Sequence, residues 1–214
     1  MNNIKALIFD LDGTLADTLP HCVKSFQLTF EQIEGREFKD TEITKHFGLS
    51  EEGIIKKVIP DKFEKGLNVF LEIYEKNHQP YSKLFDGITD ILEYCKNKGI
   101  KLAMVTGKGR GSADITLKLL GISHYFDFIE IGSAEGLIKA QCIKKILSNW
   151  QINKENVAYI GDAVTDIIES KDAGVLPIAV TWASTTNHES LALYNPYLIF
   201  SKTEDFMHWL TSTN

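Results

Sequence analysis

Two carboxylates that directly follow a short apolar run constrain this sequence more than any other feature. The run from Ala6 to Phe9 is typical of a buried strand, and it is followed at once by Asp10, Asp12 and Gly13. Side chains alternate along a strand, so Asp10 and Asp12 begin on the same side, and Gly13 permits a tight turn beyond them. Neighbouring carboxylates repel unless a cation or a shared proton relieves them. The stretch therefore predicts a metal site, a proton-transfer site or both, although Asp-Gly after a strand is also an ordinary turn signal.

The composition sets limits on the class of protein. The chain has 214 residues, of which 43% are hydrophobic and 24% charged, as in an ordinary globular protein with one sizeable core or a core plus a modest insertion. The net charge of -6 argues against binding to nucleic acid, and no apolar run approaches the ~20 residues that cross a bilayer. No signal-peptide pattern precedes the first strand, so we expect a cytoplasmic protein that binds neither nucleic acid nor membrane. Cys22, Cys95 and Cys142 are widely spaced, and we expect buried free thiols.

The residues after the first strand predict an all-helical insertion. Apolar residues at helical spacing indicate helices at about 17–34, 41–46, 51–58 and 62–78. The whole segment is too long to be an ordinary loop. We therefore expect a core domain formed by residues 1–15 and 83–214, with an α-helical domain of residues 16–82 inserted into it.

From residue 84 onward the pattern alternates between helix and strand. The expected helices are 87–98, 112–120, 140–150, 164–173 and 204–210, and the further strands are 100–105, 126–131, 157–160, 176–180 and 197–200. This alternation predicts an α/β fold with a Rossmann-like parallel sheet and helices on both faces. Three strands end at Asp10, Thr106 and Asp162, so we expect these three residues to meet at one edge of the sheet.

The string DLDGTL at residues 10–15, with Asp17 soon after, resembles the first motif of the haloacid dehalogenase-like phosphohydrolase superfamily. That family has three further motifs in a fixed order. Thr106 resembles the second, a residue whose hydroxyl binds the transferring phosphoryl group. Gly107 replaces the asparagine often found next in the phosphoglycolate phosphatase-like branch. We expect its backbone N–H to assist, together with the N-terminus of the following helix.

The third and fourth motifs follow in the same order. The third is a lysine, for which Lys139 is the best candidate although Ala140 stands where this branch usually has proline; Lys144 and Lys145 are alternatives. The string GDAVTD at residues 161–166 matches the fourth.

The four motifs imply a magnesium site. The resemblance implies that Asp10, the backbone carbonyl of Asp12 and Asp162 bind Mg²⁺, an ion that prefers about six hard oxygen ligands. Asp166 lies four residues beyond Asp162, about one helical turn away, and would support the site from behind these ligands.

The resemblance also implies a two-step phosphoryl transfer. Asp10 would attack phosphorus to form an aspartyl-phosphate, while Asp12 donates a proton to the leaving oxygen and later takes one from water. Mg²⁺, Thr106 and Lys139 would hold the phosphoryl oxygens. An acid at position 12 favours phosphate ester or anhydride chemistry over dehalogenation.

The helical insertion occupies the place where the family carries its α-helical cap. Such a lid excludes water and selects substrates. Four of its residues could face the leaving group or be ordinary surface and packing residues: His21, Arg36, Lys45 and His46.

The leading hypothesis is a Mg²⁺-dependent phosphatase of a small phosphorylated metabolite, similar to phosphoglycolate phosphatases. A β-phosphoglucomutase-like isomerase ranks lower, because the arginine-bearing cap motif of that branch is not found. A non-catalytic sensor of a phosphorylated ligand is a third alternative, but Asp10 and Asp12 are both present. A nucleotide-binding Rossmann module is disfavoured, because no Gly-x-Gly-x-x-Gly follows the first strand. The physiological substrate and the oligomeric state stay open.

Overall fold

A parallel sheet forms the centre of the computed structural model, which describes residues 4–81 and 83–213. Its strands are β1 (Ala6–Phe9), β2 (Lys101–Val105), β3 (Phe128–Glu130), β4 (Val157–Gly161), β5 (Leu176–Val180) and β6 (Leu198–Phe200). They lie in the order β3-β2-β1-β4-β5-β6, and each paired strand runs parallel to its neighbour. The predicted parallel α/β sheet is confirmed.

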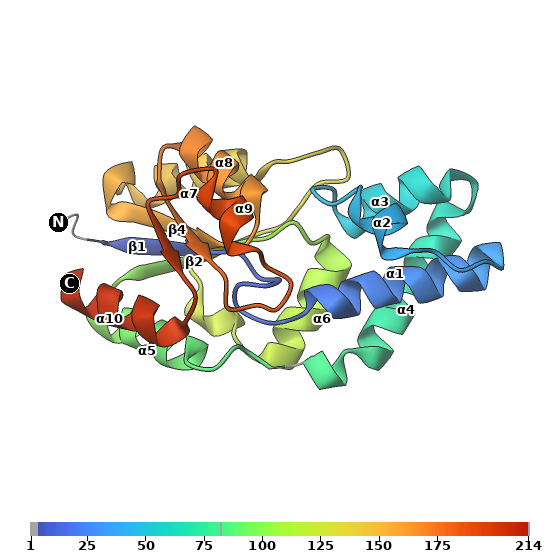
Figure 1. The fold of residues 1–214 in the computed structure, drawn as a ribbon, viewed down its shortest axis with the longest axis horizontal. Coiled ribbons are helices and arrows are strands. Elements are labelled where there is room, and N and C mark those ends of the chain that lie inside the picture. The colour runs from blue at the N-terminus through green and yellow to red at the C-terminus, as the bar shows by residue number, and fades with distance from the viewer. Residues whose placement is uncertain (1–3, 82, 214) are drawn as a thin grey trace.

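Helices cover both faces of this sheet (Figure 1). They are α5 (Ile88–Lys98), α6 (Arg110–Leu120), α7 (Lys139–Trp150), α8 (Val164–Ala173), α9 (His188–Ala192) and α10 (Thr203–Thr213), with 3-10 turns η3 (Ser123–Tyr125) and η4 (Lys154–Asn156). Leu7 and Phe9 of β1 pack in the same apolar cluster as α5, α6 and α10. Ala6 and Ile8 pack in a second cluster with α7 and the end of α8. Side chains of β1 thus alternate between the two faces of the sheet, and each face packs against its own layer of helices.

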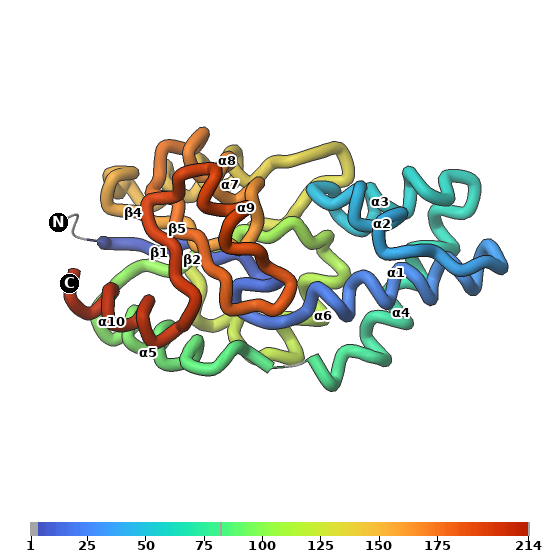
Figure 2. The backbone as a smooth tube through the Cα atoms, viewed as in Figure 1, coloured from blue at the N-terminus to red at the C-terminus, as the bar shows by residue number. Residues whose placement is uncertain are grey.

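The segment between β1 and α5 is helical, as expected. It contains α1 (Leu19–Glu34), α2 (Asp40–Thr44), α3 (Glu51–Val58), η1 (Pro60–Lys62), α4 (Phe63–Asn77) and η2 (Gln79–Tyr81). These helices have an apolar cluster of their own, in which Phe26, Phe30, Phe70 and Tyr74 are fully buried. Figure 2 shows the segment, in blue to blue-green, lying beyond the ends of β1 and β2.

The two connections between this segment and the sheet lie side by side. Ala16 forms an isolated antiparallel bridge with Leu84, and the N–H of Phe85 donates to the carbonyl of Leu15 at 3.0 Å. The division at 15/16 therefore stays a reasonable prediction. The expected second boundary, residue 82, lies outside the described residues.

Several element bounds differ from the expected ones. The strand expected at 126–131 is only Phe128–Glu130, and the helix expected from 112 begins at Arg110. The short helix α9 was not expected, because five residues are too few to show a helical period. Its N-cap, the Asn187 side chain, accepts a hydrogen bond from the N–H of Ser190 at 2.9 Å.

Two further expectations concern the cysteines and the membrane. Cys22, Cys95 and Cys142 are all free and buried, as expected. Across the described part of the chain, no helix combines the length and the apolar character that a membrane crossing requires.

Candidate active site

The sheet order places the ends of three strands next to one another. β1 lies between β2 and β4, and Phe9 is in register with both Met104 and Ile160. The N–H of Asp10 donates to the carbonyl of Ile160 at 2.9 Å, which extends the pairing one residue further. Asp10, Thr106 and Asp162 therefore follow adjacent strands at the carboxyl edge, where open α/β sheets bind ligands.

Lys139, the first residue of α7, joins two of the predicted carboxylates. Its Nζ lies 2.9 Å from Asp10 Oδ2 and 2.6 Å from Asp166 Oδ1. The two alternative lysines pair with other acids: Lys144 pairs with Asp172 on the exposed surface, and Lys145 pairs with Glu130 at the end of β3. Of the three candidates, Lys139 is the one whose ion pairs are with Asp10 and Asp166.

The carboxylates at this edge carry more negative charge than Lys139 balances. Burial, helped by the charge of Asp166, raises the pKa of Asp10 to about 7 against the lowering effect of Lys139. Burial, together with Asp166 and Asp10, also raises the pKa of Asp162 well above its usual value. Burial opposes the charge of Lys139, but Asp10 and Asp166 outweigh it and raise the lysine pKa. An additional positive charge beside Asp10 and Asp162 would stabilise their ionised forms.

The donor atoms fit a hard divalent cation. Carboxylate oxygens of Asp10, Asp162 and Asp166 lie within 4.8 Å of one another. Oxygen-only donor sets of this kind suit Mg²⁺. Asp166 is already engaged, because its Oδ1 accepts from Lys139 and its Oδ2 accepts from the N–H of Ala163 at 3.0 Å. This leaves Asp10 and Asp162 as the side chains best able to bind an ion, with Asp166 behind them.

Two glycines make room for these acids. Gly13 has a φ of +74°, and a Cβ on it would collide with the carboxylate of Asp162. A Cβ on Gly161 would collide with the carboxylate of Asp166. Close approach therefore requires glycine at both positions, and the left-handed backbone requires it at Gly13 as well.

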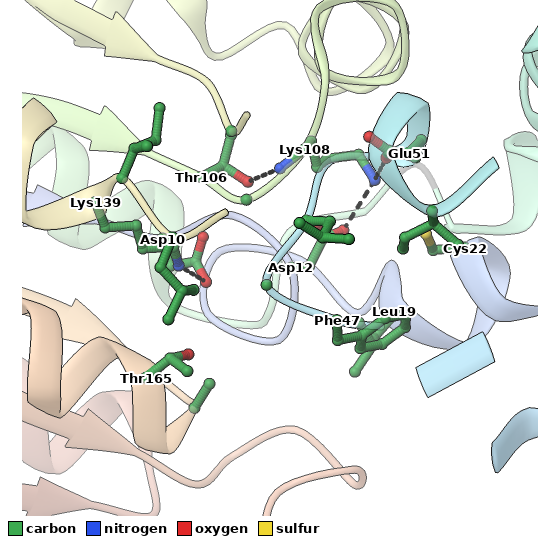
Figure 3. Close-up of a pocket in the computed structure, with 18 of the residues that line it drawn as sticks. Asp10, Asp12, Leu19, Cys22, Phe47, Glu51, Thr106, Lys108, Lys139 and Thr165 are labelled. Atoms are coloured by element: carbon green, nitrogen blue, oxygen red, sulfur yellow. Dashed lines mark hydrogen bonds and ion pairs between the residues drawn. The ribbon is translucent and has the colours of Figure 1, made fainter. Parts of the chain in front are cut away.

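Asp12 points its carboxylate toward a second group of charges. Its Oδ1 accepts a short hydrogen bond from the hydroxyl of Thr18 and lies 3.4 Å from Lys108 Nζ. Lys108 Nζ also lies 3.3 Å from Glu51 Oε1, at the start of α3. Burial lowers the pKa of Lys108, but Asp12 and the other nearby anionic groups raise it well above its usual value. Figure 3 shows Lys108 between Asp12 and Glu51, with Lys139 and Asp10 on the other side of the cavity.

Thr106 and Gly107 lie at the end of β2. Thr106 is buried, and its Oγ1 accepts from the N–H of Lys108 at 3.2 Å. Gly107 lines the cavity, and its carbonyl oxygen approaches Gly132 so closely that a Cβ there would not fit. The loop after β3 therefore holds the Thr106–Lys108 turn from one side.

A cavity of about 170 Å³ connects the two groups of charges. It is lined by residues of the sheet edge and of the helical segment, including Asp10, Thr106, Lys139 and Asp162. None of the four residues considered for the leaving group lines it: His21, Arg36, Lys45 and His46. His21 is buried among aromatic rings, and its Nε2 donates to the carbonyl of Tyr74 at 2.9 Å. Arg36 is exposed and pairs with Glu42 at 2.9 Å.

Glu51 and Lys108 are residues of this site that the sequence analysis did not predict. The Glu51 carboxylate accepts from the N–H of Gly109 and from the hydroxyl of Ser112, both at 2.5 Å, besides pairing with Lys108. Lys108 follows the Thr106 motif directly, which gave a signal for it. Glu51 belongs to a helix far away in sequence, and only the folded arrangement brings it to the cavity.

The sequence is similar to those of known proteins. The sequence model of the haloacid dehalogenase-like hydrolases matches residues 7–180. A phosphoglycolate phosphatase of Aquifex aeolicus (strain VF5) is 31% identical over 182 residues, which cover 84% of this chain and 85% of that protein. The pyrophosphatase PpaX of Anoxybacillus flavithermus (strain DSM 21510 / WK1) is 26% identical over 214 residues, 99% of each chain.

A solved structure extends the similarity to the fold. The haloacid dehalogenase-like family hydrolase SP0104 from Streptococcus pneumoniae matches with a TM-score of 0.78 and 27% identity. The match covers 98% of this chain and 99% of that one, so it includes both the sheet and the helical segment.

Proposed function

This chain belongs to the haloacid dehalogenase-like hydrolases, and we propose that it is a Mg²⁺-dependent phosphatase that hydrolyses a small phosphorylated metabolite. The observation that carries the proposal is the meeting of Asp10, Asp162 and Lys139 at the sheet edge, with Asp12 beside them on the cavity wall. A nucleophile, an acid and a cation for the phosphoryl oxygens are the groups that phosphoryl transfer needs.

In the first step, a carboxylate oxygen of Asp10 attacks phosphorus and the bond from phosphorus to the leaving oxygen breaks. Asp10 is held for this attack by the N–H of Leu11 at 2.8 Å from Oδ1 and by Lys139 at 2.9 Å from Oδ2. Asp12, protonated, donates its proton to the leaving oxygen. The Thr18 and Lys108 contacts fall on its Oδ1, which supports Oδ2 as the atom that carries the proton.

In the second step, a water oxygen bonds to phosphorus and the bond between phosphorus and Asp10 breaks. The ionised Asp12 takes the proton of that water, and inorganic phosphate leaves. Thr106 and the backbone N–H of Gly107 bind the phosphoryl oxygens, and Lys139 adds positive charge beside them. Mg²⁺ bound by Asp10, the backbone carbonyl of Asp12 and Asp162 would supply further charge stabilisation to those oxygens.

The helical segment of residues 16–82 acts in this proposal as a cap that closes the cavity. Three contacts support this role: Glu51 pairs with Lys108 and accepts from the N–H of Gly109, and the N–H of Ser50 donates to the carbonyl of Ser133 at 2.8 Å. A closed cavity excludes bulk water and strengthens the electrostatic contacts inside it.

The test is phosphate release from a panel of phosphorylated metabolites, with Mg²⁺ and with a chelator, for the native chain and Asp10→Asn. We expect release that needs Mg²⁺ and disappears in the variant. Release from the native chain that Asp10→Asn leaves intact would contradict the proposed nucleophile. Transfer of the phosphoryl group within a sugar phosphate, with no net release, would favour the isomerase instead.

A further inference from the structure

The part of the cavity beyond Asp12 is apolar. Its walls are side chains of the helical segment and of the loop before α7: Leu19, Phe26, Phe47, Leu49, Ile54 and Leu137. Because Asp10, Thr106 and Lys139 lie at the opposite end, a substrate whose phosphoryl group is at Asp10 extends its leaving group into this apolar part. The small volume of about 170 Å³ suits a small leaving group.

Among the described residues that line this end of the cavity, the one cationic side chain, Lys108, is already paired. Lys108 Nζ lies 3.4 Å from Asp12 Oδ1 and 3.3 Å from Glu51 Oε1, and the lysine side chain is almost fully buried. Glu51 is held in place by the N–H of Gly109 and the hydroxyl of Ser112. Among the residues that the structure describes, neither an arginine nor a histidine lines the cavity.

The charges at this end therefore do not attract a second anion. When Asp12 carries the proton for the first step, Lys108 and Glu51 form a neutral pair. When Asp12 is ionised, the three residues carry one net negative charge. A carboxylate or phosphate placed beside them would lose its hydration without gaining a free cation, which is costly in an apolar cavity.

On the basis of the proposed phosphatase function, we infer that the substrate is a phosphomonoester whose leaving group is a small, uncharged and largely apolar alcohol. An anionic leaving group fits the described cavity poorly. Examples are glycolate, which carries a carboxylate and leaves from phosphoglycolate, and phosphate, which leaves from pyrophosphate. The apolar wall adds to the preference, because burying methylene groups against it is favourable, whereas burying an unpaired charge is costly.

The first experiment compares three substrates with the native enzyme and Mg²⁺: propyl phosphate, phosphoglycolate and pyrophosphate. Propyl phosphate and phosphoglycolate are close in size and differ in the charge of the leaving group. We expect kcat/KM for propyl phosphate to exceed both others by roughly tenfold or more, because an anionic leaving group would lie beside the carboxylates of Asp12 and Glu51 without a free cation. Equal values, or a preference for either anion, would overturn the inference while the phosphatase function stands. No Mg²⁺-dependent turnover of any phosphomonoester would overturn both.

Variants test whether the cavity charges set this preference. Leu137 is 45% exposed at the cavity, so Leu137→Arg adds a cation without burying it. We expect it to raise kcat/KM for phosphoglycolate relative to propyl phosphate by roughly tenfold. Leu119 on α6 is 43% exposed and does not line the cavity, so Leu119→Arg is the matched control and leaves the ratio unchanged.

Glu51→Gln tests the paired lysine directly. Removing the carboxylate charge leaves Lys108 with one anionic partner fewer, so we expect the ratio to shift toward phosphoglycolate as in Leu137→Arg. If Glu51→Gln does not fold, the ratio measured for Leu137→Arg still tests whether the cavity charges set the substrate preference. An unchanged ratio in the folded variants would show that these charges do not set specificity, and would overturn the inference.

Discussion

Lys139 is the residue that holds the predicted catalytic edge together. It is the buried cation between Asp10 and Asp166, and all three side chains are largely shielded from water. A buried ion pair that loses one partner leaves an unbalanced charge, so this lysine affects both the nucleophile and the acid behind it.

We predict that Lys139→Ala lowers kcat by about 10²-fold or more, the effect typical of removing a group that stabilises transition-state charge. Lys144→Ala is the matched control on the same helix, because the Lys144 side chain forms an exposed ion pair with Asp172 and such pairs contribute little. The measurement is the steady-state kcat of the two variants and the native chain with the same substrate. Equal losses in both variants would remove Lys139 from the site.

Gly13 tests the close approach between the first and fourth motifs. Both Gly13 and Gly35 have a φ near +70°, but a Cβ on Gly35 meets no atom within 4 Å, whereas a Cβ on Gly13 meets Asp162. We predict that the left-handed backbone lowers the free energy of unfolding by about 1 kcal/mol in both Gly13→Ala and Gly35→Ala, and that the collision with Asp162 adds to this loss in Gly13→Ala alone. Only Gly13→Ala should weaken Mg²⁺ binding, measured by calorimetry. Native Mg²⁺ affinity in Gly13→Ala would contradict the predicted role of Asp162.

At the scale of elements, the sequence predicted most of what positions the site. The apolar runs at β1, β4 and β5 are continuous because both faces of a parallel sheet are buried, so their bounds were nearly right. The pairing of Glu51 with Lys108 could not be predicted, because it depends on how α3 docks against the loop after β2. The helix α9 was missed for a different reason, since it is held by a cap rather than by a periodic apolar face.

The contact between α1 and α4 contains a pH-sensitive group, His21. Burial lowers its pKa to about 4 from an ordinary value near 6.5, and the neighbouring His78 and Lys108 also lower it, against a raising effect of its bond to Tyr74. Below pH 6.5 the unfolded chain binds a proton at His21 that the folded chain does not. Stability from this group is therefore lost as the pH falls from 6.5 toward 4.

We predict that His21→Gln makes the free energy of unfolding less sensitive to acid. Between pH 7 and pH 5 the native chain should lose about 2 kcal/mol more than the variant, from the difference in proton uptake. Urea unfolding at the two pH values measures this. His208→Gln, at an exposed position on α10, serves as control, and an equal loss in native chain and His21→Gln would contradict the assignment.

At the scale of the whole molecule, the apolar side chains form separate clusters for the sheet and the helical segment. Phe26 belongs to the helical cluster and Phe206 to the sheet cluster, and both are fully buried. If residues 16–82 behave as a domain, the helical segment opens without the sheet, as a cap requires.

We predict that Phe26→Ala and Phe206→Ala each destabilise by about 3–5 kcal/mol, but in different places. Hydrogen exchange should speed up in α1, α3 and α4 in the first variant, and in β1, β5 and α10 in the second. The same pattern of exchange in both variants would mean that the sheet and the helical segment unfold as one, and would argue against the predicted division.

The proposed mechanism requires Asp10 to become covalently phosphorylated during turnover. The most direct measurement is an acid quench of the enzyme turning over an alkyl phosphate with Mg²⁺, followed by digestion and mass spectrometry of the peptide that contains residue 10. We predict a phosphoryl group on Asp10 that is absent with chelator and absent in Asp10→Asn. Turnover of the native enzyme with the phosphoryl group on another residue, or an Asp10→Asn variant that turns over at the native rate, would contradict it.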